Sequence, residues 1–374
     1  MADLTIPAEL LPSDGRLGCG PSKIRHEAVR ALYEAGPRLL GTSHRQPPVR
    51  EIVRRVRAGV RDLFDLPEGY EVVLGNGGAT AFWEVATFCL IERRSEHLAF
   101  GEFSSKFAAS TKAAPFLEDP LVIASEAGTH PVAVPDESVD AYALTHNETS
   151  TGVQMDIVRP RLASGGAAPG LVLVDATSGA GGLRVEPGEF DAYYFAPQKC
   201  FGSEGGLWCA CLSPAAIERS ERASGGRYVP AFLDLGIALK SSRLDQTYNT
   251  PATATLLLFA LQLEWFNSNG GLEFSASRSD ASAEVIYGWA ERSSFAEPFV
   301  HKPDERSHVV ATIDFDESVD AGAVAKTLRA NGIVDTDPYR KLGRNQLRVA
   351  LFPTIEPSDV EALTACVDYV VERL

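Results

Sequence analysis

Two residues with reactive side chains follow two apolar segments in the middle of the chain. Asp175 comes directly after the apolar run 171–174, and Lys199 comes shortly after the apolar run 193–196. In a parallel sheet the carboxyl ends of the strands face the ligand crevice, so an acid and a lysine at two successive strand ends would converge there. Either residue alone is more often a solvated surface charge or a helix cap. Together they predict one site.

A glycine-rich turn offers a third binding element. The sequence GNGGAT, at residues 75–80, lies between an apolar strand and an apolar helix. Glycines allow a tight turn, and the start of a helix offers free N–H groups and a partial positive charge, which suits a phosphate. The turn lacks the lysine of a P-loop and the spacing of GxGxxG, so a purely structural turn is the alternative.

The three elements together fit one cofactor chemistry. A lysine amine can hold an aldehyde cofactor as a Schiff base, and a carboxylate can keep a pyridine nitrogen protonated. Pyridoxal 5'-phosphate requires both groups and a phosphate-binding turn. Because the turn, Asp175 and Lys199 are all present, the sequence predicts an enzyme that uses this cofactor.

Seven apolar segments predict the sheet that positions these residues. They alternate with helical patterns, which is typical of βαβ units in a mainly parallel sheet of an α/β protein. The apolar helix expected at Thr253–Leu263 is shorter than the ~20 residues that a membrane span needs, so we expect it to be buried. The predicted strands are Glu71–Leu74, Leu98–Phe100, Leu121–Ala124, Ala141–Leu144, Leu171–Val174, Tyr193–Ala196 and Leu207–Leu212.

The pattern changes after the NGG sequence at 269–271. A helix at 274–292, a strand at 308–315, a helix at 321–330, a strand at 346–351 and a final helix with a Ser358–Glu361 capping box are expected there. We therefore predict a large α/β domain over residues 40–268, and a smaller α+β domain made of residues 1–39 and 269–374.

Composition and charge narrow the possible partners. The 35 Lys and Arg residues against 50 Asp and Glu give a net charge of −15, which disfavours nucleic acids and anionic membranes as partners. Small molecules and a second copy of the chain remain. The first ten residues lack the basic and apolar regions of a secretory signal, and the six cysteines form no CxxC pair. We expect a cytoplasmic protein whose thiols are reduced and buried, with no metal site.

Seven short motifs, in this order, resemble the phosphoserine aminotransferase family, and the chain is most similar to its actinobacterial branch. The resemblance covers nearly the whole chain. It implies a fold-type I pyridoxal-phosphate transferase with a seven-stranded, mainly parallel sheet in its large domain. The motifs are CGPSK at 19–23, GTSHR at 41–45, GNGGAT at 75–80, HNET at 146–149, VDATS at 174–178, APQK at 196–199 and YNTP at 248–251.

The resemblance also implies which residues bind the cofactor. Lys199 would hold it covalently, Asp175 would face the pyridine nitrogen, Phe103 would stack on the ring and Thr149 would bind near the ring hydroxyl. The remaining residues would bind the cofactor phosphate: Gly78, Ala79, Thr80 and Gln198 within the subunit, and Asn249 and Thr250 from the neighbouring one. The implied site is completed by a homodimer.

On the substrate side, the resemblance implies that His44 and Arg45 bind an anion and that Arg348 binds the α-carboxylate, with Arg340 as a candidate for the substrate phosphate. The implied reaction transfers the amino group of L-glutamate to 3-phosphohydroxypyruvate, giving O-phospho-L-serine and 2-oxoglutarate for L-serine biosynthesis. The family also serves pyridoxine biosynthesis, a role that the sequence does not assign.

Several alternatives stay open. Six of the implied site residues could instead have purely structural roles. Phe103 could be a core residue, and the others could be loop, turn or surface residues: His44, Thr149, Asn249, Arg340 and Arg348. The chain departs from many family members at Cys19, Ala79, Phe103 and Tyr339, which leaves open which residues bind the substrate phosphate. Other fold-type I enzymes, a cofactor-binding protein without activity and a nicotinamide dehydrogenase are the rival functions.

Overall fold

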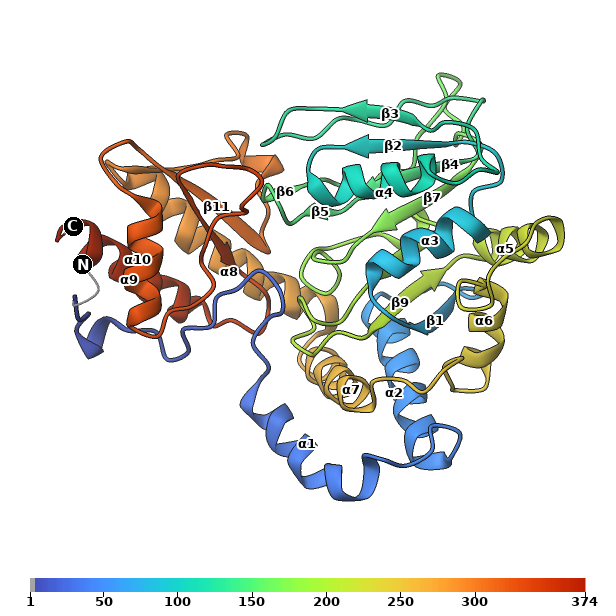
Figure 1. Ribbon diagram of the computed structural model, residues 1–374, viewed down its shortest axis with the longest axis horizontal. Helices are drawn as coiled ribbons and strands as arrows, with labels where there is room; N and C mark the ends of the chain where they lie inside the picture. Colours follow the sequence, from blue (N-terminus) through green and yellow to red (C-terminus); the bar gives the residue numbers. More distant parts are fainter. Residues whose placement is uncertain (1–3, 374) are drawn as a thin grey trace.

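A seven-stranded sheet with the order β1-β9-β8-β7-β4-β2-β3 dominates the computed structural model, which describes residues 4–373 (Figure 1). Neighbouring strands pair in parallel except at β9, which is antiparallel to both β1 and β8. The predicted mainly parallel sheet is confirmed, and each predicted strand overlaps an observed one. The strands are β1 (Glu71–Asn76), β2 (Ser95–Ala99), β3 (Leu121–Ala124), β4 (Ala141–Thr145), β7 (Leu171–Asp175), β8 (Ala192–Phe195) and β9 (Leu207–Leu212).

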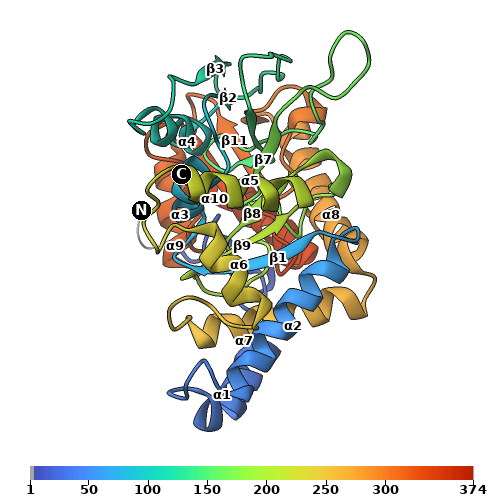
Figure 2. The same cartoon turned by 90° about the vertical axis from the view of Figure 1, so that its right-hand side faces the viewer.

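Apolar clusters bury both faces of this sheet, which explains why its strands read as continuous apolar runs. In β1, Val72 and Leu74 join the cluster that contains residues of α2 and α7, whereas Val73 joins the cluster that contains residues of α3. Helices α2 and α7 lie side by side below the sheet (Figure 2). The helices of this part are α1 (His26–Leu39), α2 (Pro47–Leu63), α3 (Ala79–Cys89), α4 (Glu102–Lys112), α5 (Pro214–Gly226), α6 (Leu235–Arg243) and α7 (Thr253–Ser268).

Strand β2 begins three residues earlier than predicted because its polar residues are paired inside the protein. Ser95, Glu96 and His97 are all buried. The Ser95 hydroxyl and His97 Nε2 lie 2.9 Å apart, and the Glu96 carboxylate accepts the N–H of Val134 at 3.0 Å. Polar residues with buried partners are compatible with a central strand, but the apolar pattern alone does not indicate them.

A second, three-stranded antiparallel sheet, with the order β10-β11-β12, forms the lobe that carries both chain termini in Figure 1. Ile6 and Leu17 from the start of the chain belong to its apolar cluster. The division at residues 40 and 269 remains a prediction. The elements here are α8 (Gly271–Arg292), β10 (Ala296–Pro298), β11 (Val310–Phe315), α9 (Ala321–Ala330), β12 (Gln346–Ala350) and α10 (Pro357–Val371), and a separate small hairpin pairs β5 (Asn147–Glu148) with β6 (Val153–Gln154).

The predicted capping box of the last helix is wrong. Helix α10 begins at Pro357, its N-cap is Glu356, and no side chain caps it. Proline is suited to the first helical position because its φ is fixed and its missing N–H needs no partner. The acidic residue of this first turn, Asp359, instead accepts the N–H and hydroxyl of Ser13 and pairs with Lys23, so it connects the helix to the start of the chain.

All six cysteines are free and buried, which confirms the prediction of buried thiols in the core. Helix α7 is buried along most of its length, as its all-round apolar composition predicts. Within residues 4–373 no helix combines the length and apolarity needed to cross a bilayer.

The turn before β2 should be a sensitive point of stability. The Asp140 carboxylate accepts the N–H groups of Glu92, Arg93 and Arg94 at 2.7–2.9 Å and lies 3.3 Å from the Arg219 guanidinium. We expect Asp140→Ala to lower the free energy of unfolding by about 2–4 kcal/mol, because it leaves three N–H groups without their acceptor and removes one of the two carboxylates that face the largely buried Arg219.

Urea denaturation followed by circular dichroism measures this loss. The control is Asp119→Ala, which removes an exposed carboxylate 3.5 Å from Lys112 and should cost less than about 0.5 kcal/mol. Equal losses for the two variants would contradict the assigned role of Asp140.

Candidate active site

The parallel pairing of β7 with β8 brings the predicted acid and lysine to the same edge of the sheet. Asp175, the last residue of β7, pairs in register with Tyr194, and β8 ends one residue later at Phe195. Lys199 follows within four residues. The convergence predicted from the two strand ends is therefore present.

The Lys199 amine is buried and held by the CGPSK segment. Its Nζ donates a hydrogen bond to the carbonyl oxygen of Cys19 at 2.6 Å. Loss of hydration on burial is the main cause that lowers the pKa of Lys199 to about 8; the positive charge of Arg348 acts in the same direction, and Cys19, Cys200 and Asp175 oppose it. About a tenth of this amine is thus neutral and nucleophilic at pH 7, far more than of an ordinary lysine.

Gly20 leaves the space that the lysine occupies. A Cβ atom at this position would lie 2.4 Å from Lys199 Nζ and 2.5 Å from its Cε, and the backbone φ of +126° is in the region that favours glycine. Glycine is therefore required at this position of the CGPSK motif on steric grounds, because any side chain would collide with the Lys199 amine.

Asp175 is only 4% exposed, and both of its oxygens accept hydrogen bonds. Oδ2 accepts the indole N–H of Trp83 at 2.7 Å, and Oδ1 accepts the N–H and the hydroxyl of Thr177 at 2.9 and 2.5 Å. Burial raises the pKa of Asp175, and the hydrogen bonds from Thr177 and Trp83 and the charge of Lys199 oppose that shift.

The glycine turn connects β1 to α3 and is open on its outer side. Strand β1 ends at Asn76, Gly78 is the N-cap of α3, and the helix begins with Ala79 and the exposed Thr80. A Cβ at Gly78 would have no atom within 4 Å, so the space above the turn is open.

The segment that carries Asn249 and Thr250 lies beside this turn within the same chain. The Asn76 side chain accepts the N–H of Asn249 at 3.3 Å and donates to the Thr250 carbonyl at 2.9 Å. His44 also lies here, with Nδ1 3.2 Å from the Thr250 hydroxyl, while the neighbouring Arg45 is exposed. Burial, and secondly Arg45, lower the pKa of His44, so this imidazole is mainly neutral at pH 7.

A buried carboxylate holds Phe103 near the start of α4. Glu148 is fully buried and accepts the N–H groups of Phe103 and Ser104 at 3.1 and 2.9 Å. The adjacent Thr149 is buried and donates to the Ser178 hydroxyl at 2.7 Å. The residues predicted for the cofactor ring are thus connected through the HNET motif.

Arg348 extends from β12 towards this site. Its Nη1 donates to the carbonyl of Thr149 at 3.2 Å, and its guanidinium lies 5.2 Å from the centre of the Tyr339 ring. Arg340 and Arg348 both line a cavity of about 530 Å³ that also contains Cys19 and Gly20. The structure therefore brings Arg340 and Arg348 together, whereas His44 and Arg45 lie with Thr250 beside the glycine turn.

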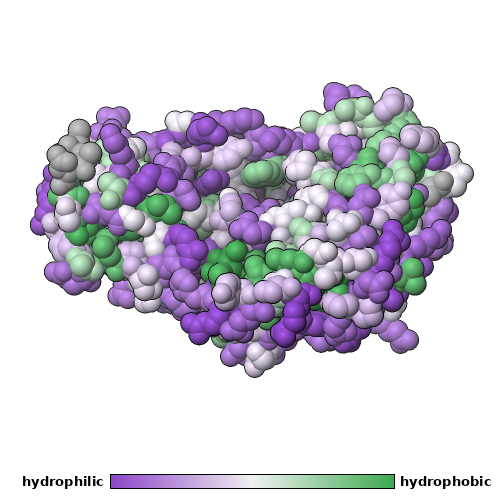
Figure 3. All heavy atoms as spheres, turned by 60° about the horizontal axis from the view of Figure 1, so that its bottom comes forward, coloured by the Kyte–Doolittle hydropathy of each residue, from purple (hydrophilic) through white to green (hydrophobic). Residues whose placement is uncertain are grey.

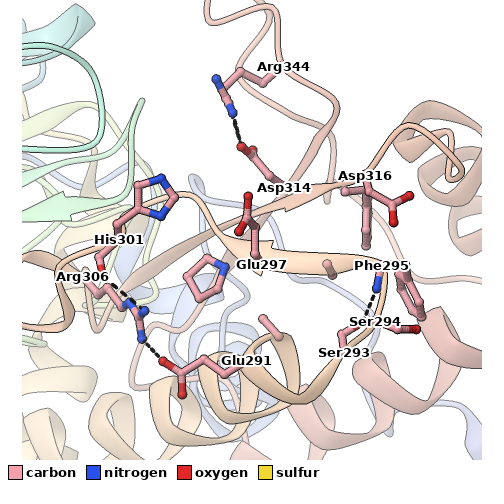
Figure 4. Close-up of a pocket in the computed structure, with 14 residues that line it drawn as sticks. Glu291, Ser293, Ser294, Phe295, Glu297, His301, Arg306, Asp314, Asp316 and Arg344 are labelled. Atoms are coloured by element: carbon pink, nitrogen blue, oxygen red, sulfur yellow. Dashed lines mark hydrogen bonds and ion pairs between the residues drawn. The ribbon is translucent and has the colours of Figure 1, made fainter.

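A cavity of about 620 Å³ in the lobe of the second sheet has a different character (Figure 4). Its two arginines already have carboxylate partners, since Arg306 pairs with Glu291 and Arg344 pairs with Asp314. With its cations neutralised, this cavity is poorly suited to a doubly anionic substrate.

Three contacts at the site were absent from the sequence prediction. The contacts are those of Trp83 and Thr177 with Asp175 and of the Cys19 carbonyl with Lys199. The sequence places Trp83 only in an apolar helix and Thr177 only in a motif. A backbone carbonyl leaves no signal in a sequence, because every residue has one. Only Thr177 had a usable signal, since a hydroxyl two residues after an aspartate commonly forms a local turn with it.

Comparison with known proteins agrees with this arrangement. The family model described as "Aminotransferase class-V" matches residues 126–336, more than half of the chain. Fold and site together therefore define an aminotransferase of this class.

Relatives that match over their full length show which family of class-V aminotransferases the chain belongs to. The chain is 59% identical over 372 residues to a phosphoserine aminotransferase of a Nocardioides species, covering 99% of both chains, and 57% identical over 370 residues to that of Rhodococcus opacus, covering 99% of this chain and 98% of the relative. The chain belongs to the phosphoserine aminotransferase family.

Solved structures confirm the fold. The phosphoserine aminotransferase of Cytophaga hutchinsonii superimposes with a TM-score of 0.85 at 22% identity, covering 95% of this chain and 99% of that one. An alanine–glyoxylate aminotransferase from Nostoc has a TM-score of 0.77 at 20% identity, covering 99% and 98%. Because both share the fold, the fold alone does not select the substrate.

The clearance around Lys199 yields a mutational test. We expect Gly20→Ala to lower turnover at least ~100-fold, because the added methyl group displaces the amine from its position and such displacements have effects of this size. Steady-state kinetics and cofactor absorbance measure the loss.

Gly165→Ala is the matched control. Gly165 also has a positive φ, of +86°, but an added Cβ would meet no atom within 4 Å. This variant should keep turnover within about twofold of wild type and lose only about 1 kcal/mol of stability. A similar turnover for both variants would show that Gly20 is not needed for the lysine.

Proposed function

We propose that this protein is a pyridoxal-phosphate-dependent phosphoserine aminotransferase. It exchanges an amino group between L-glutamate and 3-phosphohydroxypyruvate, giving O-phospho-L-serine and 2-oxoglutarate in L-serine biosynthesis. The observation that carries the proposal is the pairing of Asp175 and Lys199 at adjacent strand ends, in a chain 57–59% identical over its full length to relatives that bear this name.

The residues present fit the cofactor. Lys199 supplies a partly neutral amine, Asp175 a buried carboxylate, and the start of α3 an open turn of N–H groups. Two buried polar atoms, Gln198 Oε1 and Arg348 Nε, have no hydrogen-bond partner among residues 4–373. Buried polar atoms are normally paired, so these two atoms suit a bound ligand.

In the mechanism each residue of the chain has a separate task. When bound, the cofactor supplies an aldehyde that accepts the amino group and a ring that accepts electron density from the substrate Cα. Lys199 takes the proton from Cα, a general-base role that typically contributes ~10²–10⁴-fold. Asp175 keeps the pyridine nitrogen protonated. Phe103 and Thr149, which are linked through the HNET motif, orient the ring.

The substrate carries an anionic group at each end. Arg348 binds the α-carboxylate, because a planar guanidinium can form two parallel charge-assisted bonds to it. Arg340, which lines the same cavity as Arg348, binds the phosphate or the side-chain carboxylate. His44 and Arg45 lie apart from it, beside the glycine turn, and would bind an anion there. Because the pKa of His44 is lowered, this residue acts as a hydrogen-bonding group and Arg45 provides the charge.

The site is completed by a homodimer, in which Asn249 and Thr250 reach the cofactor phosphate of the neighbouring subunit. Support comes from exposed large hydrophobic side chains on α1 and close to these residues in the chain. Figure 3 shows green apolar areas among purple polar ones on the face that it presents. Such side chains commonly mark a protein interface. They are Val29, Tyr33, Leu40, Leu244 and Tyr248.

We also propose that the enzyme works in the cytoplasm. Its six cysteines are buried and unpaired, and free thiols are typical of a reducing compartment.

A comparison of amino donors tests the proposed reaction. With 2-oxoglutarate as acceptor, we expect kcat/KM for O-phospho-L-serine to exceed that for L-alanine or L-serine at least ~100-fold, since a site built for a phosphate loses charge-assisted bonds with donors that lack it. A higher value for alanine or serine would favour a glyoxylate-type aminotransferase instead.

The lowered pKa of Lys199 predicts the pH dependence of cofactor capture. Only the neutral amine reacts with the aldehyde, so the rate of reconstitution should rise about tenfold per pH unit below pH 8 and level off above it. Absorbance after adding pyridoxal phosphate to cofactor-free protein gives the rate. N-acetyl-lysine amide, an ordinary amine, should continue to gain rate towards pH 10. The same course for protein and model amine would contradict the shifted pKa.

Arg348 should control substrate affinity rather than cofactor affinity. We expect Arg348→Ala to raise KM for both L-glutamate and O-phospho-L-serine by roughly 10–100-fold, the usual effect of losing a charge-assisted hydrogen-bonded pair. Arg184→Ala, which removes an exposed arginine paired with Glu273 and Asp280, is the control and should leave both KM values unchanged. An unchanged KM for glutamate in Arg348→Ala would exclude the carboxylate role.

A further inference from the structure

Trp83 lies in the interior of the protein with its polar atom directed at the acid of the site. The side chain is 5% exposed, and its Nε1 donates to Asp175 Oδ2 at 2.7 Å. The two residues are 92 positions apart in the chain and come from α3 and β7. This contact links the helix that begins at the glycine turn to the strand that ends at the acid.

The other hydrogen bonds of Asp175 are local. Thr177 donates its N–H and hydroxyl to Oδ1 from only two residues away, and an aspartate commonly accepts the N–H two residues further along in a local turn. Trp83 is the donor that fixes the second oxygen from another element. Together the two residues define the plane of the carboxylate.

The indole is itself held in place. Its ring is stacked on Phe107 of α4, with ring centres 6.2 Å apart and an interplanar angle of 16°, and it belongs to the apolar cluster on that face of the sheet. Because the indole nitrogen can only donate a hydrogen bond, it favours the ionised carboxylate over the neutral acid. It thus opposes the effect of burial, which raises the pKa of Asp175.

We propose that Trp83 is a positioning residue for Asp175, which keeps this carboxylate ionised and oriented towards the pyridine nitrogen of the cofactor. This inference rests on the proposed function. Because Ala79, Thr80 and Trp83 belong to one helix, α3 sets the distance between the phosphate cradle and the acid through a rigid element. The alternative is that Trp83 only fills space in the core, in which case its ring matters and its N–H does not.

Three variants separate these roles. Trp83→Phe keeps an aromatic ring and removes the donor, whereas Trp83→His restores a donor on a smaller ring. Trp208→Phe is the matched control, since Trp208 is 2% exposed, lies in the same apolar cluster and forms no hydrogen bond with Asp175 among residues 4–373. Each variant is titrated with pyridoxal phosphate, and its visible absorption band, dissociation constant and melting temperature are measured.

We expect Trp83→Phe to weaken cofactor binding roughly tenfold, the usual effect of losing a hydrogen bond to a charged group, and to shift the absorption band. Trp208→Phe should change the dissociation constant less than twofold and leave the band in place. Trp83→His should recover part of the affinity even if its melting temperature falls as far as that of Trp83→Phe.

Two results would overturn the inference: a Trp83→Phe variant that matches Trp208→Phe in affinity and spectrum, or a Trp83→His variant that recovers nothing. Both are distinguishable from failure of the proposed function, in which the wild-type protein itself would bind no pyridoxal phosphate or show no spectral response to O-phospho-L-serine.

Discussion

Parallel pairing of β7 with β8 is the constraint on which the site depends. The register that sets Asp175 beside Tyr194 brings the end of β7 next to the loop that carries Lys199. The carboxyl ends of parallel neighbours lie at the same edge of the sheet, so the fold itself brings the acid and the amine together. The other contacts refine this arrangement: Gly20 admits the amine, Trp83 and Thr177 hold the carboxylate, and the turn before α3 is the proposed binding place for the cofactor phosphate.

Burial favours the uncharged form of both groups, which suits the nucleophilic amine of Lys199 but works against an ionised Asp175. Loss of hydration lowers the pKa of Lys199 to about 8, which frees its amine, and raises the pKa of Asp175, against which Thr177 and Trp83 act. The protein as a whole carries a charge of −15, yet Arg340 and Arg348 line the same cavity. Asp335 and Asp337 line this cavity too, but both pair with Arg329, which leaves Arg340 and Arg348 to attract an anionic substrate.

Much of this arrangement could be predicted from the sequence, because it depends on residue type and periodicity. The seven strands follow from apolar runs, and the convergence of Asp175 and Lys199 follows from their places after two of them. The role of Trp83 could not be predicted, since a tryptophan in an apolar helix looks like any core residue. The paired polar residues at the start of β2, the proline start of α10 and the bond from Arg348 to the Thr149 carbonyl, 199 positions away, depend on tertiary contacts that leave no local pattern.

The central claim concerns the attachment of the cofactor, and reductive trapping tests it most directly. The protein is loaded with pyridoxal phosphate and treated with borohydride, and its peptides are then mapped by mass spectrometry. We expect one modified peptide, with the added mass on Lys199. Modification of a different lysine, or none at all in protein that binds the cofactor, would contradict it.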